Sequence, residues 1–285
     1  MAASFSDGAA GVAPLPRAGE YFMLAGGVRL WVERCGSGPP LVLVPGLGAG
    51  TWLWDEVADT LAARFTLIMP ELRGSGRSDK PDERYTIQGF ATDVIELLDR
   101  LGIASYHLLG ASMGGFVAQH IAAQSPARVQ RLVLAATTSG GAAQIGPTGD
   151  VLTRLIRPHG RTRRERFEDA YELGFTGAFR LARRDLLDRI TALRLAHPQP
   201  EFAYYRQLLA GHAWDGVADV RRIVAPTLIC TGAADVVVPP ANGTALEATL
   251  QDARLVVFPG AHMFFLENGA AFARAVGDFL TESAP

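Results

Sequence analysis

Short apolar runs alternate with stretches of helical spacing along most of the chain. The runs end at turn-forming residues, as strands buried on both faces of a parallel sheet do, and lie at 41–44, 65–69, 106–109, 129–135, 226–231 and 254–258. The stretches between them with helical spacing lie at about 52–63, 87–101, 112–125, 240–248 and 267–282. Residues 20–23 and 28–34 predict a hairpin. The expected class is therefore α/β, with a mostly parallel central sheet covered by helices on both faces.

The interval 138–214 breaks this alternation. It offers no convincing strand, and its helical stretches lie at 150–157, 163–174, 179–196 and 201–210. We expect an all-helical cap at the carboxyl ends of the strands, where open α/β sheets bind ligands. The predicted organisation is a flexible tail at 1–18, a core formed by 19–137 and 215–285, and this inserted cap at 138–214.

The pattern around Ser112 carries the first chemical signal. Gly110-Ala-Ser-Met-Gly114 joins a buried strand to a helix and has the Gly-x-Ser-x-Gly spacing of a nucleophile elbow. Glycine at 110 and 114 would relieve the crowding of such a tight turn. Ser112 would then stand clear of the sheet at a helix N-terminus, which favours a developing negative charge. The alternative is an incidental match in a glycine-rich chain.

A serine nucleophile needs a base, and the base needs an orienting acid. Asp235 and His262 each follow a predicted buried strand at its carboxyl end, the edge where Ser112 emerges. The order Ser112, Asp235, His262 is the one expected after such an elbow. Asp235 could instead cap the helix that begins near Pro239, and His262 could be a loop histidine without a role.

Acyl transfer also needs backbone N–H groups that bind the oxyanion. We expect one from Met113, directly after the nucleophile, and one from Leu47 in the glycine-rich loop 45–50. An ordinary strand-to-helix connection is the alternative for that loop. The expected substrate pocket lies between cap and sheet, with candidate wall residues Gly46, Trp52, Val237, Met263 and His212.

Composition limits the other classes. With 285 residues and 48% hydrophobic content the chain can bury a sizeable core, and its net charge of −2 implies no nucleic-acid or membrane partner. The cap holds 12 Arg against 8 acidic residues, which either reflects solvated helix faces or includes an arginine that meets an anionic substrate. The scattered histidines and the lack of Cys/His ligand spacing argue against a metal site.

Cysteine usage and the chain ends suggest a compartment. Cys35 and Cys230 lie in strand-like contexts and are expected to be buried free thiols, which fits a reducing environment. The N-terminus has no basic segment followed by an apolar core, and no apolar run reaches the length of a membrane span. We therefore expect a soluble cytoplasmic protein; its oligomeric state is open.

Together these motifs resemble the α/β-hydrolase superfamily over about residues 20–282. The resemblance rests on Pro45-Gly-Leu-Gly, Leu72-Arg-Gly-Ser-Gly-Arg-Ser-Asp, the elbow, and the Asp235/His262 pair followed by Met263-Phe-Phe-Leu-Glu267. Within the superfamily the chain looks most like esterases and lactonases of the 3-oxoadipate enol-lactonase type. The resemblance implies a Ser-His-Asp hydrolase with a helical cap and no cofactor.

Two positions depart from the family pattern. The His that usually precedes the oxyanion glycine is Pro45 here, so the anchoring of that loop is open although its backbone donors remain. The Asp that usually opens the Arg-Gly-x-Gly loop is Glu71, which we interpret as a structural change.

The expected function is hydrolysis of a small-molecule carboxylic ester or lactone through an acyl-enzyme on Ser112. Two alternatives stay open. The same triad could cleave carbon–carbon bonds or pass the acyl group to an acceptor other than water. The chain could also be a receptor of this fold with very low turnover.

Overall fold

The computed structural model describes residues 17–142, 144–156 and 162–282. Its centre is an eight-stranded sheet in the order β1-β2-β4-β3-β5-β6-β7-β8, in which β2 runs antiparallel to both neighbours and the remaining neighbouring pairs are parallel. The strands are β1 (Ala18–Met23), β2 (Arg29–Cys35), β3 (Pro40–Val44), β4 (Thr66–Pro70), β5 (Tyr106–Ala111), β6 (Val129–Ala135), β7 (Thr227–Gly232) and β8 (Ala253–Phe258). The predicted class and hairpin are confirmed.

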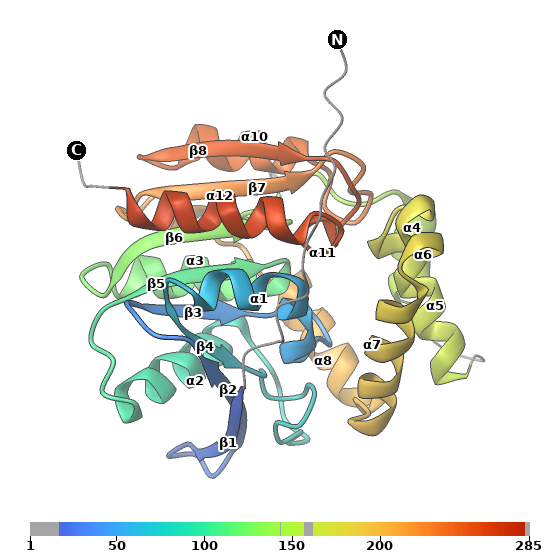
Figure 1. Ribbon diagram of the computed structural model, residues 1–285, viewed down its shortest axis with the longest axis horizontal. Helices are drawn as coiled ribbons and strands as arrows, with labels where there is room; N and C mark the ends of the chain where they lie inside the picture. Colours follow the sequence, from blue (N-terminus) through green and yellow to red (C-terminus); the bar gives the residue numbers. More distant parts are fainter. Residues whose placement is uncertain (1–16, 143, 157–161, 283–285) are drawn as a thin grey trace.

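Helices cover both faces of the sheet and enclose a hydrophobic core on each (Figure 1). One face packs against α1 (Asp55–Ala62), α11 (Phe264–Glu267) and α12 (Gly269–Thr281). The other packs against α2 (Ile87–Arg100), α3 (Met113–Gln124), α9 (Val217–Val220) and α10 (Ala241–Thr249). The central strands are buried on both sides, which explains their continuous apolar runs.

Between β6 and α9 the elements are helices that lie beyond the carboxyl ends of the parallel strands (Figure 1). They are α4 (Gly149–Ile156), α5 (Arg163–Gly174), α6 (Gly177–Ala182), α7 (Arg184–Ala196) and α8 (Glu201–His212). The fold therefore includes an inserted helical cap. The end of the predicted helix at 150–157 and most of the predicted tail at 1–18 lie outside the described residues.

Three sequence-based elements need correction. The single helix expected at 179–196 is two helices, α6 and α7, divided at Arg183. The helix expected from Trp52 begins as the short 3-10 helix η1 (Thr51–Trp54) before α1. The strand at 254–258 exists but is not buried on both faces, because β8 is the edge strand and Val257 is 55% exposed.

Both cysteines are buried free thiols, as the sequence predicts. In the part of the chain that the structure describes, none of the helices is sufficiently long and apolar to cross a membrane.

Candidate active site

Ser112 occupies the turn between β5 and α3. Its backbone has φ 55° and ψ −120°, a conformation that a residue with a side chain rarely adopts. Two hydrogen bonds hold the turn: Ser112 N–H donates to Ala135 O at 2.9 Å, and the Thr137 hydroxyl donates to Ser112 O at 2.9 Å. The strained serine is thus fixed from strand β6 and from the residues that follow it.

Gly110 and Gly114 are required by close packing around this turn. A Cβ on Gly110 would lie 2.3 Å from Gly114 O, and a Cβ on Gly114 would lie 2.1 Å from Val44 O. Both distances are far below van der Waals contact. The crowding expected from the sequence is present, and at Gly114 it comes from the neighbouring strand β3 rather than from β5.

The structure brings Ser112, His262 and Asp235 into one hydrogen-bonded chain. His262 Nε2 lies 3.1 Å from Ser112 Oγ, and His262 Nδ1 lies 2.8 Å from Asp235 Oδ2. An ionised carboxylate only accepts hydrogen bonds, so Nδ1 carries the proton and Nε2 is free to accept one from the serine. Both His262 and Asp235 are buried.

The second oxygen of Asp235 fixes the carboxylate itself. Oδ1 accepts hydrogen bonds from Val237 N–H and Val238 N–H, each at 2.8 Å. Helix α10 begins only at Ala241, with Pro240 as its N-cap. The alternative that Asp235 caps this helix is therefore wrong.

His262 is held through the backbone on either side of it. Glu267 Oε1 accepts from Ala261 N–H at 2.9 Å and from Thr176 N–H at 3.1 Å, and Met263 N–H donates to Gly174 O at 2.7 Å. Gly174 and Thr176 belong to the cap. The loop that carries the histidine is therefore tied to the cap as well as to the core.

The loop after β3 approaches the serine closely. A Cβ on Gly46 would lie 3.2 Å from the Ser112 Cβ and 3.7 Å from its Oγ, so only the backbone of this loop fits there. Leu47, the candidate donor, follows directly and is half-buried, and Met113 opens α3 at the first helical position. The N–H groups of a first helical turn have no partner within the helix.

Gln207 on α8 anchors this loop from the side of the cap. Its side-chain oxygen accepts from Gly48 N–H at 3.0 Å, and its side-chain nitrogen donates to Arg73 O at 2.9 Å. Ser75 Oγ lies 2.8 Å from the same nitrogen. Gln207 is fully buried, and this one cap residue connects the loop after β3 with the loop that contains Arg73 and Ser75.

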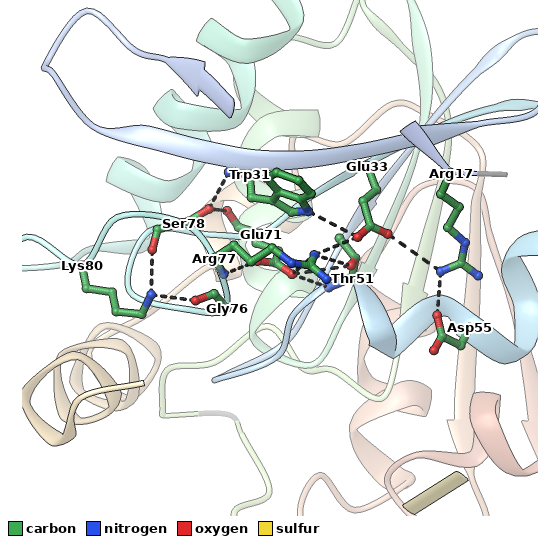
Figure 2. A network of polar contacts seen from close by, with 10 residues as sticks. All are labelled: Arg17, Trp31, Glu33, Thr51, Asp55, Glu71, Gly76, Arg77, Ser78 and Lys80. Atoms are coloured by element: carbon green, nitrogen blue, oxygen red, sulfur yellow. Dashed lines mark hydrogen bonds and ion pairs between the residues drawn. The ribbon is translucent and has the colours of Figure 1, made fainter. Parts of the chain in front are cut away.

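Glu71 anchors the far end of the same loop (Figure 2). Its carboxylate accepts from Thr51 N–H at 3.1 Å and pairs with the Arg77 guanidinium at 3.2 Å, and Arg77 also pairs with Glu33 on β2 at 2.8 Å. A Cβ on Gly50 would lie 2.6 Å from Glu71 Oε1. The network around Glu71 supports a structural role for this departure from the family pattern.

A cavity of about 530 Å³ opens above Ser112 between the core and the cap. Its size is that of a small-molecule site. Its walls include Ser112, His262, both candidate oxyanion residues and every wall residue expected from the sequence: Gly46, Leu47, Trp52, Met113, His212, Val237 and Met263. Asp235 lies behind His262 and does not line it. No group of three His, Cys, Asp or Glu in the described ranges is arranged to hold a metal ion.

Sequence reasoning missed three residues around this site. Gln207 and Arg194 come from the cap, and Glu267 acts through the loop that carries His262. Gln207 and Arg194 lie in helices without any motif, so only the tertiary structure relates them to Ser112. Glu267 stands within a stretch that supported the family resemblance, and the arginine excess of the cap indicated, as one alternative, a ligand-binding arginine without identifying Arg194.

Comparison with known proteins assigns the family. The model of the α/β hydrolase fold family matches residues 39–269. The chain belongs to the α/β-hydrolase family. It is a hydrolase by the same comparison, and the mostly parallel sheet, the elbow and the helical cap fit that family.

Similar α/β hydrolases act on different bonds. A pimeloyl-[acyl-carrier protein] methyl ester esterase of Chromobacterium violaceum is 29% identical, over 90% of this chain and 100% of its own length. A 2-hydroxymuconate semialdehyde hydrolase of Pseudomonas is 28% identical, over 92% of this chain and 93% of its own length. The crystal structure of an enol-lactonase from Burkholderia xenovorans superposes with a TM-score of 0.82 at 26% identity, covering 92% of this chain and 100% of that one.

Proposed function

We propose that this α/β hydrolase cleaves carboxylic esters or lactones through an acyl-enzyme on Ser112. The observation that carries the proposal is the chain of contacts from Ser112 Oγ to His262 Nε2, at 3.1 Å, and from His262 Nδ1 to Asp235 Oδ2, at 2.8 Å. Ser112 and His262 line a cavity whose other walls are mostly apolar side chains. The esterase and the enol-lactonase among the similar proteins support this bond class.

In the proposed first half-reaction Ser112 Oγ attacks the substrate carbonyl carbon while His262 Nε2 takes the serine proton. Asp235 stabilises the imidazolium that forms, and its two bonds to Val237 and Val238 keep it in place. The N–H groups of Met113 and Leu47 stabilise the carbonyl oxygen as it becomes negative. The bond between the acyl carbon and the leaving oxygen then breaks as His262 gives its proton to that oxygen. An ester releases an alcohol, and a lactone leaves a hydroxyacyl group on Ser112.

The second half-reaction runs with water in place of the alcohol. His262 Nε2 takes a proton from the water molecule as its oxygen attacks the acyl carbon. The bond to Ser112 Oγ breaks, the serine regains a proton from His262, and the carboxylic acid leaves. No group beyond the chain and water is needed to balance these steps.

The test is turnover of p-nitrophenyl butyrate and δ-valerolactone by the wild type, by Ser112→Ala and by His262→Gln. We expect each variant to lower kcat by about 10⁴-fold or more, with the folded state preserved in circular dichroism. Near-normal turnover by Ser112→Ala would overturn the mechanism.

Carbon–carbon bond hydrolysis is the second candidate, favoured by the similarity to the 2-hydroxymuconate semialdehyde hydrolase. Here the same serine and histidine would act on a ketone and release a carbon leaving group. Turnover of vinylogous diketones faster than that of any ester, lost in Ser112→Ala, would favour this candidate over ester hydrolysis.

A further inference from the structure

The arginines of the cap differ in their surroundings. Six of those described form ion pairs with carboxylates: Arg154, Arg166, Arg180, Arg183, Arg189 and Arg206. Arg163, Arg164 and Arg184 are exposed to solvent. Solvated helix faces therefore account for most of the arginine excess in the cap. Arg194, on α7, belongs to neither group.

Aromatic side chains surround the Arg194 guanidinium. Its central carbon lies 4.0 Å from the centre of the Phe167 ring and 5.7 Å from that of the Trp52 ring, and Tyr171 and Tyr204 are close enough to act on its charge. Within the described residues no carboxylate forms an ion pair with it, and the undescribed internal residues, 143 and 157–161, include no Asp or Glu. Burial lowers the pKa of Arg194, because the charged form loses solvation.

Arg194 lies where two cavities meet. It lines the cavity above Ser112 and also a second, smaller cavity of about 130 Å³, which lies between the cap and the core loops that contain Gly48 and Arg77. The charged side chains at the second cavity include Arg77, Arg154 and Arg166, which pair with Glu71, Asp169 and Glu201 respectively. Arg194 is thus a cation that lines both cavities, and none of the described Asp or Glu residues forms an ion pair with it.

A guanidinium at a cavity wall, without a carboxylate partner, can bind an anionic group of a ligand in that cavity. Arg194 is half-buried, and contacts with aromatic rings stabilise a cation by only about 0.5–2 kcal/mol. A carboxylate matches the planar fork of an arginine and accepts two parallel hydrogen bonds from it. A dianionic phosphate would keep uncompensated charge here, because one guanidinium and several apolar walls cannot replace its hydration. The chemistry therefore fits a monoanionic carboxylate.

We propose that Arg194 is the specificity-determining residue of this site and binds a carboxylate that the substrate carries in addition to its scissile ester or lactone. The inference rests on the proposed function, since it places this carboxylate in the cavity that also contains Ser112. A purely structural alternative exists, in which Arg194 only joins Phe167 of the cap to Trp52 of the core. The two accounts differ in what the loss of the charge does to neutral substrates.

Matched ester pairs separate the two accounts. The p-nitrophenyl half-esters of succinate, glutarate and adipate carry the anion on the acyl side, and p-nitrophenyl esters of neutral acids of similar length serve as references. In a second pair, 4-acetoxybenzoate carries the anion on its leaving group and phenyl acetate is the neutral reference. In at least one pair the wild type should hydrolyse the anionic ester with the higher kcat/KM. Arg194→Met should lower kcat/KM for that anionic ester about 10- to 100-fold and change kcat/KM for its neutral partner by no more than about threefold.

Two further variants control for charge and folding. Arg189→Met removes the same charge from the same helix at an exposed position and should leave the preference unchanged. Arg194→Lys keeps the charge without the planar fork and should lose several-fold of the preference, which tests the proposal even where Arg194→Met does not fold. Equal losses for anionic and neutral esters, or a wild type without any anionic preference, would overturn the proposal.

Binding measured without turnover distinguishes this inference from the proposed function. Glutarate or adipate should raise the Tm of Ser112→Ala, but not that of the Ser112→Ala/Arg194→Met double variant at the same ionic strength. If this stabilisation requires Arg194 while no ester is hydrolysed, the anion site stands and the proposed function fails. If neutral esters are hydrolysed and the dicarboxylates stabilise neither or both variants, the proposed function stands and the anion site fails.

Discussion

The Gln207 side-chain oxygen on α8 accepts a hydrogen bond from Gly48 N–H at 3.0 Å, so a cap helix holds the loop that carries the candidate oxyanion donor Leu47. The two residues are 159 positions apart in the sequence. Gln207 also bonds Arg73 O and Ser75 Oγ in a second core loop, and it accepts a bond from Gln199 of the cap. The position of the cap and the geometry of the proposed oxyanion site are therefore mechanically linked.

Gln207→Leu removes this link with little change in side-chain volume. Because Gly48 N–H then loses its partner and the loop loosens, we expect kcat for p-nitrophenyl butyrate to fall about 10-fold with KM nearly unchanged, less than the ~100-fold typical for loss of a whole oxyanion donor. The affinity for phenylboronic acid, which forms a tetrahedral adduct on serine, should fall in parallel. Gln88→Leu, an exposed position on α2, is the matched control. A rise in KM alone would contradict a role in positioning the loop.

Gly114→Ala tests the close packing under the elbow. The added Cβ would meet Val44 O at 2.1 Å, so α3 or β3 must shift. We expect the free energy of unfolding to fall by about 1–3 kcal/mol and esterase activity to fall with it, both measured on purified protein. Gly26→Ala is the control, because nothing lies within 4 Å of the position of its Cβ. Equal stabilities of the two variants would show that the elbow has room to relax.

His107 on β5 should make stability depend on pH. Burial, with a smaller contribution from Arg131, lowers its pKa to about 4 in the folded protein, from the ordinary histidine value of 6.5. Between these values the unfolded chain binds a proton that the folded chain does not, so stability present above pH 6.5 is lost as the pH falls toward 4. The free energy of unfolding that His107 removes over this pH range is about 3 kcal/mol.

Replacing His107 by Gln removes the titration at that position. Urea unfolding of wild type and His107→Gln at pH 7 and pH 4.5 should show a smaller loss of stability in the variant. Identical losses in both proteins would assign the pH dependence to other groups.

The sequence predicted those features that depend on short stretches of chain. Ser112 lies between Gly110 and Gly114 within a strand–turn–helix that can be read locally, and Asp235 and His262 follow strands whose apolar runs are plain. Parallel strands place their carboxyl ends at one edge, so three residues distant in sequence could be expected together. The catalytic roles of these residues remain predictions.

What the sequence could not predict depends on contacts between cap and core. Gln207 and Arg194 acquire their surroundings only when α8 and α7 pack above the sheet, and neither helix contains a motif that marks them. The division between α6 and α7 at Arg183 was missed because no Pro or Gly lies between 179 and 196. The exposure of β8 was missed because its apolar composition resembles that of a central strand although it forms the edge.

Pre-steady-state hydrolysis of p-nitrophenyl acetate and butyrate tests the acyl-enzyme on Ser112 most directly. We expect a burst of about one p-nitrophenol per chain in the wild type, followed by steady turnover, and neither phase in Ser112→Ala. Mass spectrometry of the quenched wild type should find the acyl group on the peptide that contains Ser112. The acyl group on another residue, or equal hydrolysis by wild type and Ser112→Ala, would contradict the account.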